Sequence, residues 1–183
     1  AEMGHDPSRE PPFFFQKPVD ALVQDGATVP DPAITDDFQY EVELVLAIGA
    51  SPVDNTEAST RDAVYAFGVG IDLTRRDVQV AARKTGRPWE IGKSFDHSAP
   101  CSELVSVSAT PLPEDGAITL EVNGVSKQAG DISQMIWKPF EIVSKLSEQY
   151  ALMPGDIIYT GTPAGVGPLS RGDKVTAKFR GIC

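Results

Sequence analysis

The sequence is poor in cysteine, histidine and positive charge. Its 183 residues include two cysteines and two histidines, and neither cysteine has the spacing of a zinc site or a redox motif. A disulfide framework is therefore excluded, and a reducing, cytoplasmic location is expected. Lysine and arginine total 16 against 26 aspartate and glutamate, which gives a net charge of −10. The chain thus lacks the basic surface that binding to nucleic acid or to an anionic membrane requires.

Long apolar runs and a serine-nucleophile motif are also missing. No apolar run approaches the roughly 18 residues of a membrane-spanning helix. No Gly-x-Ser-x-Gly sequence is present, so a serine triad has no support. Sixteen glycines and 15 prolines instead predict short elements joined by many turns. Prolines are frequent in residues 1–35, which we expect to be loop-like.

What is present is mainly a series of strand patterns. Strands are predicted over residues 40–48, 65–71, 118–122, 125–128, 157–160 and 175–179. Asn123-Gly124 predicts a tight hairpin. Helices are predicted over 75–84, with Thr74 as N-cap and Gly86 as the stop, and from Pro139 onward. Because strands outnumber helices and no strand–helix–strand rhythm occurs, the fold class is predicted to be α+β, mainly β.

Two acidic residues share one face of the strand over residues 40–48. The two-residue period places Glu41 and Glu43 about 7 Å apart, on the face that continues into Val45 and Ala47. The simpler interpretation is a half-solvated strand with both acids exposed to solvent. If the face is buried, the two charges repel unless a cation lies between them, and a divalent ion with oxygen ligands fits.

A third acid follows the next strand, which carries only small residues on one of its two faces. Ala66, Gly68 and Gly70 leave room for another group to approach, and Asp72 stands at the strand end. Asp72 either caps the following helix or is a third metal ligand. Three carboxylates favour Mg²⁺ or Mn²⁺ over zinc, which prefers nitrogen and sulfur.

Further polar residues lie where they could serve such a site. Arg76 and Gln79 are three apart on the predicted helix and share a face. Lys93, between Gly92 and Ser94, is either a surface charge or an electrostatic stabiliser of a bound carbonyl. The glycine-rich loop over residues 160–167 could aim backbone N–H groups at an anion.

These motifs, in this order, resemble the fumarylacetoacetate hydrolase family. The resemblance spans almost the whole chain and is carried by residues 41–44, 70–79, 92–96, 122–124, 154–156 and 160–167. Within the family, residues 2–18, 73–76 and 95–100 are most similar to the branch that hydrolyses fumarylpyruvate. Any one motif is common, but the ordered set is highly specific.

The resemblance implies a fold, a metal site and an assembly. It implies a mixed β-roll, with residues 1–35 as an N-terminal lid and loop segment and residues 36–183 as the catalytic domain. It also implies a homodimer. The ion, Mg²⁺ or Mn²⁺, would be held by Glu41, Glu43 and Asp72.

The resemblance further implies an activity and roles for individual residues. The expected reaction is hydrolysis of a carbon–carbon bond in a 2,4-dioxo acid, with fumarylpyruvate giving fumarate and pyruvate. Lys93 would assist as a positioned cation. Glu2 would activate water together with a histidine expected two residues upstream of this sequence. The small dicarboxylic oxo acid would be oriented by Arg76, Gln79 and Thr162.

Other functions fit the same residues. On one scaffold, decarboxylation of oxaloacetate or isomerisation of a 2-hydroxy-dienedioate also passes through a metal-bound enolate, and the metal-site motifs do not separate these reactions. A non-catalytic β domain that binds a metal or a small anion is a different class of answer.

Overall fold

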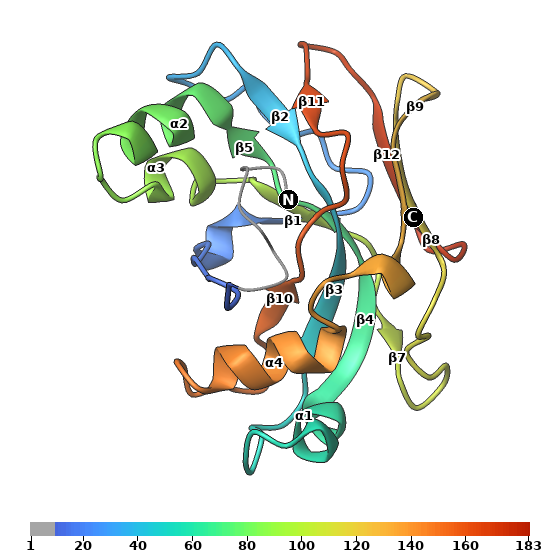
Figure 1. Ribbon diagram of the computed structural model, residues 1–183. Helices are drawn as coiled ribbons and strands as arrows, with labels where there is room; N and C mark the ends of the chain where they lie inside the picture. The colour runs from blue at the N-terminus through green and yellow to red at the C-terminus, as the bar shows by residue number, and fades with distance from the viewer. Residues whose placement is uncertain (1–9) are drawn as a thin grey trace.

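Three sheets form the frame of the protein in the computed structural model, which describes residues 10–183 (Figure 1). The largest contains, in spatial order, β1 (Leu22–Gln24), β6 (Ala99–Cys101), β4 (Val64–Ile71), β3 (Val42–Ile48) and β10 (Ile157–Tyr159), with β7 (Val105–Ser106) paired to β4. The second contains β12 (Val175–Phe179), β8 (Ala117–Val122) and β9 (Val125–Asp131). The third contains β11 (Gly167–Pro168), β2 (Phe38–Tyr40) and β5 (Thr74–Arg75).

The helices are short and lie in two groups around these sheets. Helices α1 (Glu57–Ala63) and α4 (Pro139–Ser147) lie together near one end of β3 and β4, and α2 (Arg76–Lys84) and α3 (Glu90–Lys93) lie together near the other (Figure 1). Single 3₁₀ turns occupy Val19–Ala21 and Ile132–Gln134. Within residues 10–183, no helix has the length and apolar character needed to cross a bilayer. The predicted class, α+β and mainly β, is confirmed.

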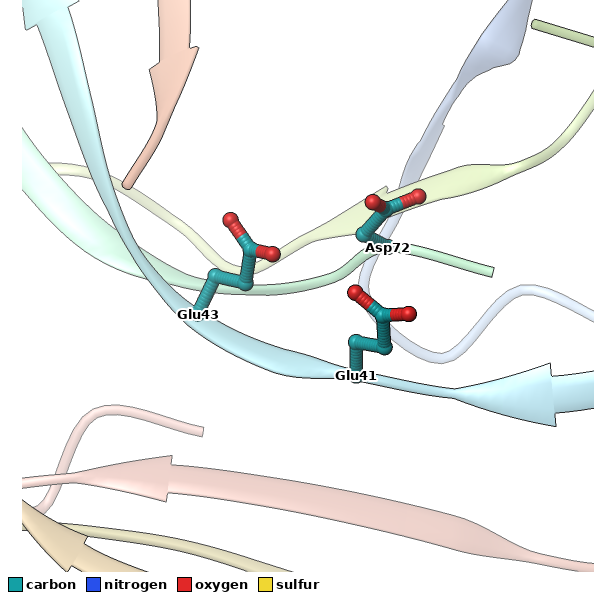
Figure 2. Close-up of side chains that lie close together, drawn as sticks. All are labelled: Glu41, Glu43 and Asp72. Atoms are coloured by element: carbon teal, nitrogen blue, oxygen red, sulfur yellow. The ribbon is translucent and has the colours of Figure 1, made fainter. Parts of the chain in front are cut away.

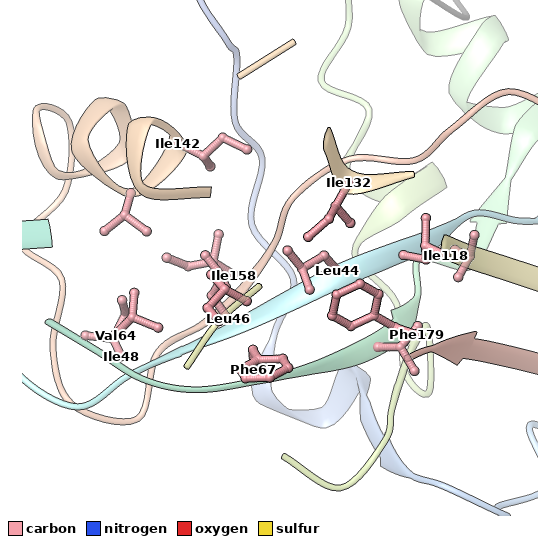
Figure 3. Packing of buried hydrophobic residues seen from close by; sticks show 14 of the residues in the cluster. Leu44, Leu46, Ile48, Val64, Phe67, Ile118, Ile132, Ile142, Ile158 and Phe179 are labelled. Atoms are coloured by element: carbon pink, nitrogen blue, oxygen red, sulfur yellow. The ribbon is translucent and has the colours of Figure 1, made fainter. Parts of the chain in front are cut away.

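One face of β3 supplies the centre of the hydrophobic core. Val42, Leu44, Leu46 and Ile48 are buried in one cluster with side chains from β4, β8, β12 and α4, which include Phe67, Ile118, Phe179 and Ile142 (Figure 3). Val45 and Ala47 are also buried but lie outside this cluster, on the opposite face. The two-residue alternation that placed the acids is therefore confirmed, and both faces of β3 are covered.

The bare face of β4 is filled by a tyrosine from β10. Gly70 lies opposite Glu43 in the antiparallel β3–β4 ladder. A methyl group added at Gly70 would lie 2.5 Å from the Tyr159 ring and 2.8 Å from Val45. The Tyr159 hydroxyl donates to two carbonyl groups of β6 at 3.0 Å. Glycine is therefore required so that this ring can cross β4 beside Glu43.

Local sequence signals are confirmed at the hairpin and in part at the helix. Asn123 and Gly124 have φ values of +53° and +77°, as a type I′ turn requires. Gly86, with φ of +64°, follows the end of α2. The helix begins at Arg76, however, and Thr74 belongs to β5 and does not cap it.

The strand predicted over residues 40–48 is interrupted at Glu41. Residues before this point pair with β5 and β11 in the small sheet, and residues from Val42 onward pair with β4 and β10. The chain thus passes from one sheet to another at an acidic residue of the candidate site.

Part of the N-terminal segment also belongs to the large sheet. Strand β1 pairs in parallel with β6, with Leu22 opposite Ala99. The prediction of a wholly loop-like segment missed this three-residue strand. The proposed boundary between residues 1–35 and 36–183 stays a prediction.

Candidate functional site

Three buried carboxylates converge at the junction of the sheets (Figure 2). Glu43 projects from β3, Glu41 directly precedes this strand, and Asp72 directly follows β4. One oxygen of each lies within 4.8 Å of the others. The residues are 7%, 4% and 2% exposed for Glu41, Glu43 and Asp72. The interpretation of a half-solvated acidic strand is therefore wrong, and so is that of Asp72 as a helix cap, because α2 begins four residues later.

Main-chain pairing fixes this convergence. The N–H of Asp72 donates to the carbonyl of Glu41 at 2.8 Å, so the β3–β4 ladder continues one step beyond both strands. In that register, Glu41 faces Asp72 while Glu43 faces Gly70. The side chains of residues 41 and 43 point to the same side because they are two apart along an extended chain.

The carboxylate of Glu43 is the least compensated of the three. The N–H of Gly161 donates to its Oε2 at 2.7 Å. Burial raises the pKa of Glu43 well above its usual range, and the charges of Asp72 and Glu41 raise it further. In addition, the buried Asp72 Oδ1 accepts no hydrogen bond of favourable geometry within the described chain, although Nζ of Lys17 lies 2.8 Å away. The three carboxylates offer only oxygen atoms as ligands, which is what a hard divalent cation prefers.

Lys93 is buried against the same acids. Its Nζ lies 2.6 Å from Asp72 Oδ2 and 3.1 Å from Glu41 Oε1, and it donates to the Thr74 hydroxyl at 2.7 Å. Burial opposes its charge, yet Asp72 and Glu41 outweigh that effect and raise the pKa of Lys93. The interpretation of Lys93 as a surface charge is therefore wrong: it is a buried cation.

A second lysine, Lys17, comes from the N-terminal segment. Its Nζ lies 2.8 Å from Asp72 Oδ1 and donates to the Ser98 hydroxyl at 2.9 Å and to the carbonyls of Leu73, Lys93 and Ser98. Burial lowers the pKa of Lys17, although Asp72 partly offsets this. A basic residue that follows three consecutive phenylalanines is the signal that could have identified it.

Arg76 and Gln79 lie together, as their spacing predicted. Arg76 forms an ion pair with Glu41 through Nη2, and its Nη1 donates to Gln79 Oε1 at 2.7 Å. Its Nε donates to Gln39 Oε1 at 2.8 Å, a partner that the sequence did not indicate. Gly92 packs on the main chain of Gln79, where an added methyl group would lie 2.9 Å away. These contacts hold α2 and α3 close to the acids.

The glycine-rich loop reaches the site beside Glu43. Thr160 donates its hydroxyl to the carbonyl of Leu44 at 2.9 Å, and Gly161 binds Glu43 as described. Thr162 follows and accepts a hydrogen bond from Gln128 Nε2 at 2.8 Å. Of the predicted site residues, seven therefore lie in one region. Glu2 lies outside the described residues.

The metal-free protein is expected to become less stable as the pH rises above the ordinary pKa of a glutamate, about 4.5. The folded-state pKa of Glu43 lies above this unfolded value. Between these two values the folded state binds more protons, so the free energy of unfolding falls with rising pH. The charges of Glu41, Asp72 and Lys93 act on Glu43 and determine how far its folded-state pKa lies above the unfolded value.

Thermal melts of wild type and of Glu43→Gln in chelator, across this pH range, test the expectation. Because other groups titrate in both proteins, the difference between the two melting curves isolates Glu43. A difference that does not grow with pH would contradict the assignment.

The fold and the acidic site together point to one enzyme family. Residues 1–183 match the fumarylacetoacetate (FAA) hydrolase C-terminal family, and the chain belongs to this family. The β-roll that the resemblance implied is confirmed, and the chain is an enzyme of this hydrolase family rather than a non-catalytic domain.

Individual relatives cover nearly the whole chain. A fumarylpyruvate hydrolase from Ralstonia sp. is 45% identical over 177 residues, which are 97% of this chain and 92% of that protein. The crystal structure of fumarylpyruvate hydrolase from Pseudomonas aeruginosa in complex with Mn²⁺ and pyruvate is similar, with a TM-score of 0.93 and 47% identity over 98% of this chain and 79% of that one. An oxaloacetate tautomerase from Escherichia coli (strain K12) is 39% identical over 181 residues, 98% of this chain and 82% of that protein.

Proposed function

We propose that this enzyme hydrolyses the carbon–carbon bond of an acylpyruvate, with fumarylpyruvate giving fumarate and pyruvate. The observation that carries the proposal is the buried triad of Glu41, Glu43 and Asp72, with two lysines beside it. The identity to two fumarylpyruvate hydrolases, one of them solved with Mn²⁺ and pyruvate, supports the choice of substrate.

The reaction requires a stabilised carbanion as leaving group. In an acylpyruvate, water first adds to the distal carbonyl carbon. The bond between this carbon and the neighbouring CH₂ group then breaks, which releases the enolate of pyruvate. Glu41, Glu43 and Asp72 would hold a divalent ion, which would supply Lewis-acid stabilisation of this developing negative charge. The carboxylates fit such an ion because they are buried and close together, and because Asp72 Oδ1 accepts no hydrogen bond of favourable geometry within the described chain.

Lys93 serves this mechanism as a fixed cation. Its raised pKa keeps the ammonium group protonated at neutral pH, so it is suited to stabilise an enolate oxygen and unsuited to act as a base. Its contacts with Asp72, Glu41 and Thr74 hold the group in place before substrate arrives. Preorganised charge of this kind is effective because the site excludes water.

Substrate orientation falls to Arg76, Gln79 and Thr162. Arg76 can offer donors to a substrate carboxylate from its position beside Glu41. Gln79 fixes the guanidinium plane through its own carbonyl oxygen, and Thr162 would provide a hydroxyl from the loop whose Gly161 binds Glu43. With a divalent ion bound, these residues and Lys17 would give the acidic protein a locally positive site for a dianion.

Activation of water is proposed for Glu2, as the family resemblance implies. Glu2 lies outside the described residues, so this part of the mechanism stays a prediction. The homodimer also stays a prediction. Mg²⁺ and Mn²⁺ are both proposed as the ion, since an all-carboxylate set serves either.

A second candidate is enolate chemistry without hydrolysis. The sequence similarity to an oxaloacetate tautomerase favours this candidate. Keto–enol interconversion passes through the enolate that the same site would stabilise, and so do decarboxylation and isomerisation of related oxo acids. Hydrolysis differs only in requiring an activated water at the distal carbonyl.

An assay of purified enzyme on a small panel of oxo acids tests the proposal. We expect fumarylpyruvate to be converted to equal amounts of fumarate and pyruvate with Mn²⁺ or Mg²⁺, and the rate to vanish when the ion is removed by chelator. Oxaloacetate is the matched comparison substrate, followed by its enol absorbance and by pyruvate release. Turnover of oxaloacetate without cleavage of fumarylpyruvate would favour the second candidate and contradict the first.

A further inference from the structure

A buried glutamine, Gln128, connects the acid-bearing strand to the glycine-rich loop. It lies on β9, in the neighbouring sheet, and is 1% exposed. Its side-chain amide accepts a hydrogen bond from the N–H of Val42 at 2.9 Å. The same amide donates to the Thr162 hydroxyl oxygen at 2.8 Å and to the Pro163 carbonyl at 2.9 Å. Val42 is the residue between Glu41 and Glu43.

The partners of this amide fix its orientation. A backbone N–H only donates, so the group facing Val42 is the carbonyl oxygen of Gln128. A backbone carbonyl only accepts, so the group facing Pro163 is the amide nitrogen. The hydroxyl of Thr162, which lies beside the same nitrogen, must therefore act as the acceptor in that contact.

The direction of this hydrogen bond determines what Thr162 can offer a ligand. Because its oxygen accepts from Gln128, the hydroxyl hydrogen of Thr162 is free to point toward another acceptor. The carboxylate and carbonyl oxygens of an oxo acid are acceptors only. We propose that Gln128 is a positioning residue, which orients the Thr162 hydroxyl as a hydrogen-bond donor to the substrate; this inference rests on the proposed function.

Close packing supports a role for β9 in placing the loop. A methyl group added at Gly165 would lie 2.5 Å from the carbonyl oxygen of Lys127, and one added at Gly130 would lie 2.8 Å from the Pro163 side chain. The loop therefore lies directly against β9 on both sides of Gln128. Gly161 of this loop donates to Glu43. The packing of the loop on β9 therefore fixes both Thr162 and Gly161, the residue that binds Glu43.

A purely structural role is the competing explanation. At the point where the chain passes from β2 to β3, the N–H of Val42 is buried, and leaving it without an acceptor would destabilise the fold. Gln128 satisfies this group whatever Thr162 does. The two roles differ in one respect: only the positioning role makes the effect of losing Gln128 depend on the Thr162 hydroxyl.

A double-mutant cycle on the full chain separates the two roles. The variants are Gln128→Met, which keeps the volume and removes both polar atoms, Thr162→Val, which removes the hydroxyl, and their combination. The measurements are KM and kcat for fumarylpyruvate and the inhibition constant of pyruvate, at saturating Mn²⁺. We expect each single variant to raise KM about tenfold, as for a lost hydrogen bond to a charged group. In the Thr162→Val background, Gln128→Met should add less than about twofold.

Controls distinguish this inference from the proposed function. The wild-type rate on fumarylpyruvate tests the proposed function, and the ratios between variants test only the role of Gln128. Ser126→Ala, at an exposed position on the same strand, should leave KM unchanged. Melting temperature and Mn²⁺ affinity report whether each variant is folded with an intact triad. If Gln128→Met does not fold, Gln128→Asn replaces it, since the shorter amide reaches one side of the bridge only.

Three results would overturn the proposal. Equal effects of Gln128→Met on KM in both backgrounds would show that Gln128 acts independently of Thr162. An unchanged KM in folded Gln128→Met would show that the amide does not orient the hydroxyl. Loss of folding in both Gln128 variants would assign this glutamine to stability alone.

Discussion

The Glu43→Gln variant is expected to lose about a thousandfold or more in kcat while remaining folded. Replacing one carboxylate of the triad by an amide removes a charged ligand of the proposed ion, and the electrostatic contribution of such an ion is worth several kcal/mol in the transition state. The amide is nearly the same size, and its oxygen can still accept the hydrogen bond from the N–H of Gly161.

The same substitution is expected to stabilise the metal-free protein. Burial and two neighbouring carboxylates disfavour the charge on Glu43, and the amide removes that unfavourable charge. A gain of about 1 kcal/mol corresponds to about 2–4 °C in melting temperature for a chain of this size. Loss of activity combined with gain of stability is the signature of a group retained for function rather than for the fold.

Asp72→Ala provides the informative comparison. It should also abolish activity, but it should lower the melting temperature, because Lys17 and Lys93 would lose the carboxylate that both contact in the interior. Activity assays with Mn²⁺, calorimetric titration of Mn²⁺ and melts in chelator measure these differences. Activity near wild type in Glu43→Gln would remove this residue from the metal site. A lowered melting temperature in Glu43→Gln, or a raised one in Asp72→Ala, would contradict the charge distribution described.

The Lys93→Met variant is expected to lower kcat by about 10²–10³-fold without weakening Mn²⁺ binding. The loss corresponds to that of one preorganised donor at a site of developing negative charge. Metal affinity should stay equal or rise, because the ammonium group lies within 3.1 Å of oxygens of both Asp72 and Glu41, which the ion would also use. Methionine fills a similar volume and leaves the buried hydroxyl of Thr74 with fewer partners.

Single-turnover kinetics and calorimetric titration with Mn²⁺ test this prediction. Lys84→Met, an exposed lysine at the end of α2, is the matched control and should change neither quantity. An unchanged rate in Lys93→Met would remove Lys93 from the mechanism. A large loss of Mn²⁺ affinity would instead indicate that Lys93 supports the geometry of the triad.

Features encoded by neighbouring residues could be predicted from the sequence. The Asn123-Gly124 turn depends on positive φ angles that these two residues tolerate. The shared face of Glu41 and Glu43 follows from the period of an extended chain, and the contact of Arg76 with Gln79 follows from the pitch of a helix. Each depends on residues within four positions of one another.

Features that depend on distant partners could not be predicted in this way. The strand breaks at Glu41 where the N–H of Val42 bonds to Gln128, 86 residues away. Thr74 looked like a helix cap from its neighbours, but its hydroxyl instead accepts from Lys93, 19 residues later. The burial of Lys17 likewise depends on Asp72, which directly follows β4 and is far along the chain.

The number of charged groups around the triad has a thermodynamic consequence. Two of its three carboxylates, Glu41 and Asp72, contact three cationic side chains, Lys17, Lys93 and Arg76. The three formal negative charges of the triad are therefore matched by three positive ones before any ligand is bound. A divalent ion then adds two positive charges, and a dianionic oxo acid adds two negative ones. Each should raise the affinity for the other, and by the same factor, because coupling between two binding equilibria is reciprocal. At low concentrations of both, this enzyme would respond to the product of ion and substrate concentrations rather than to each alone.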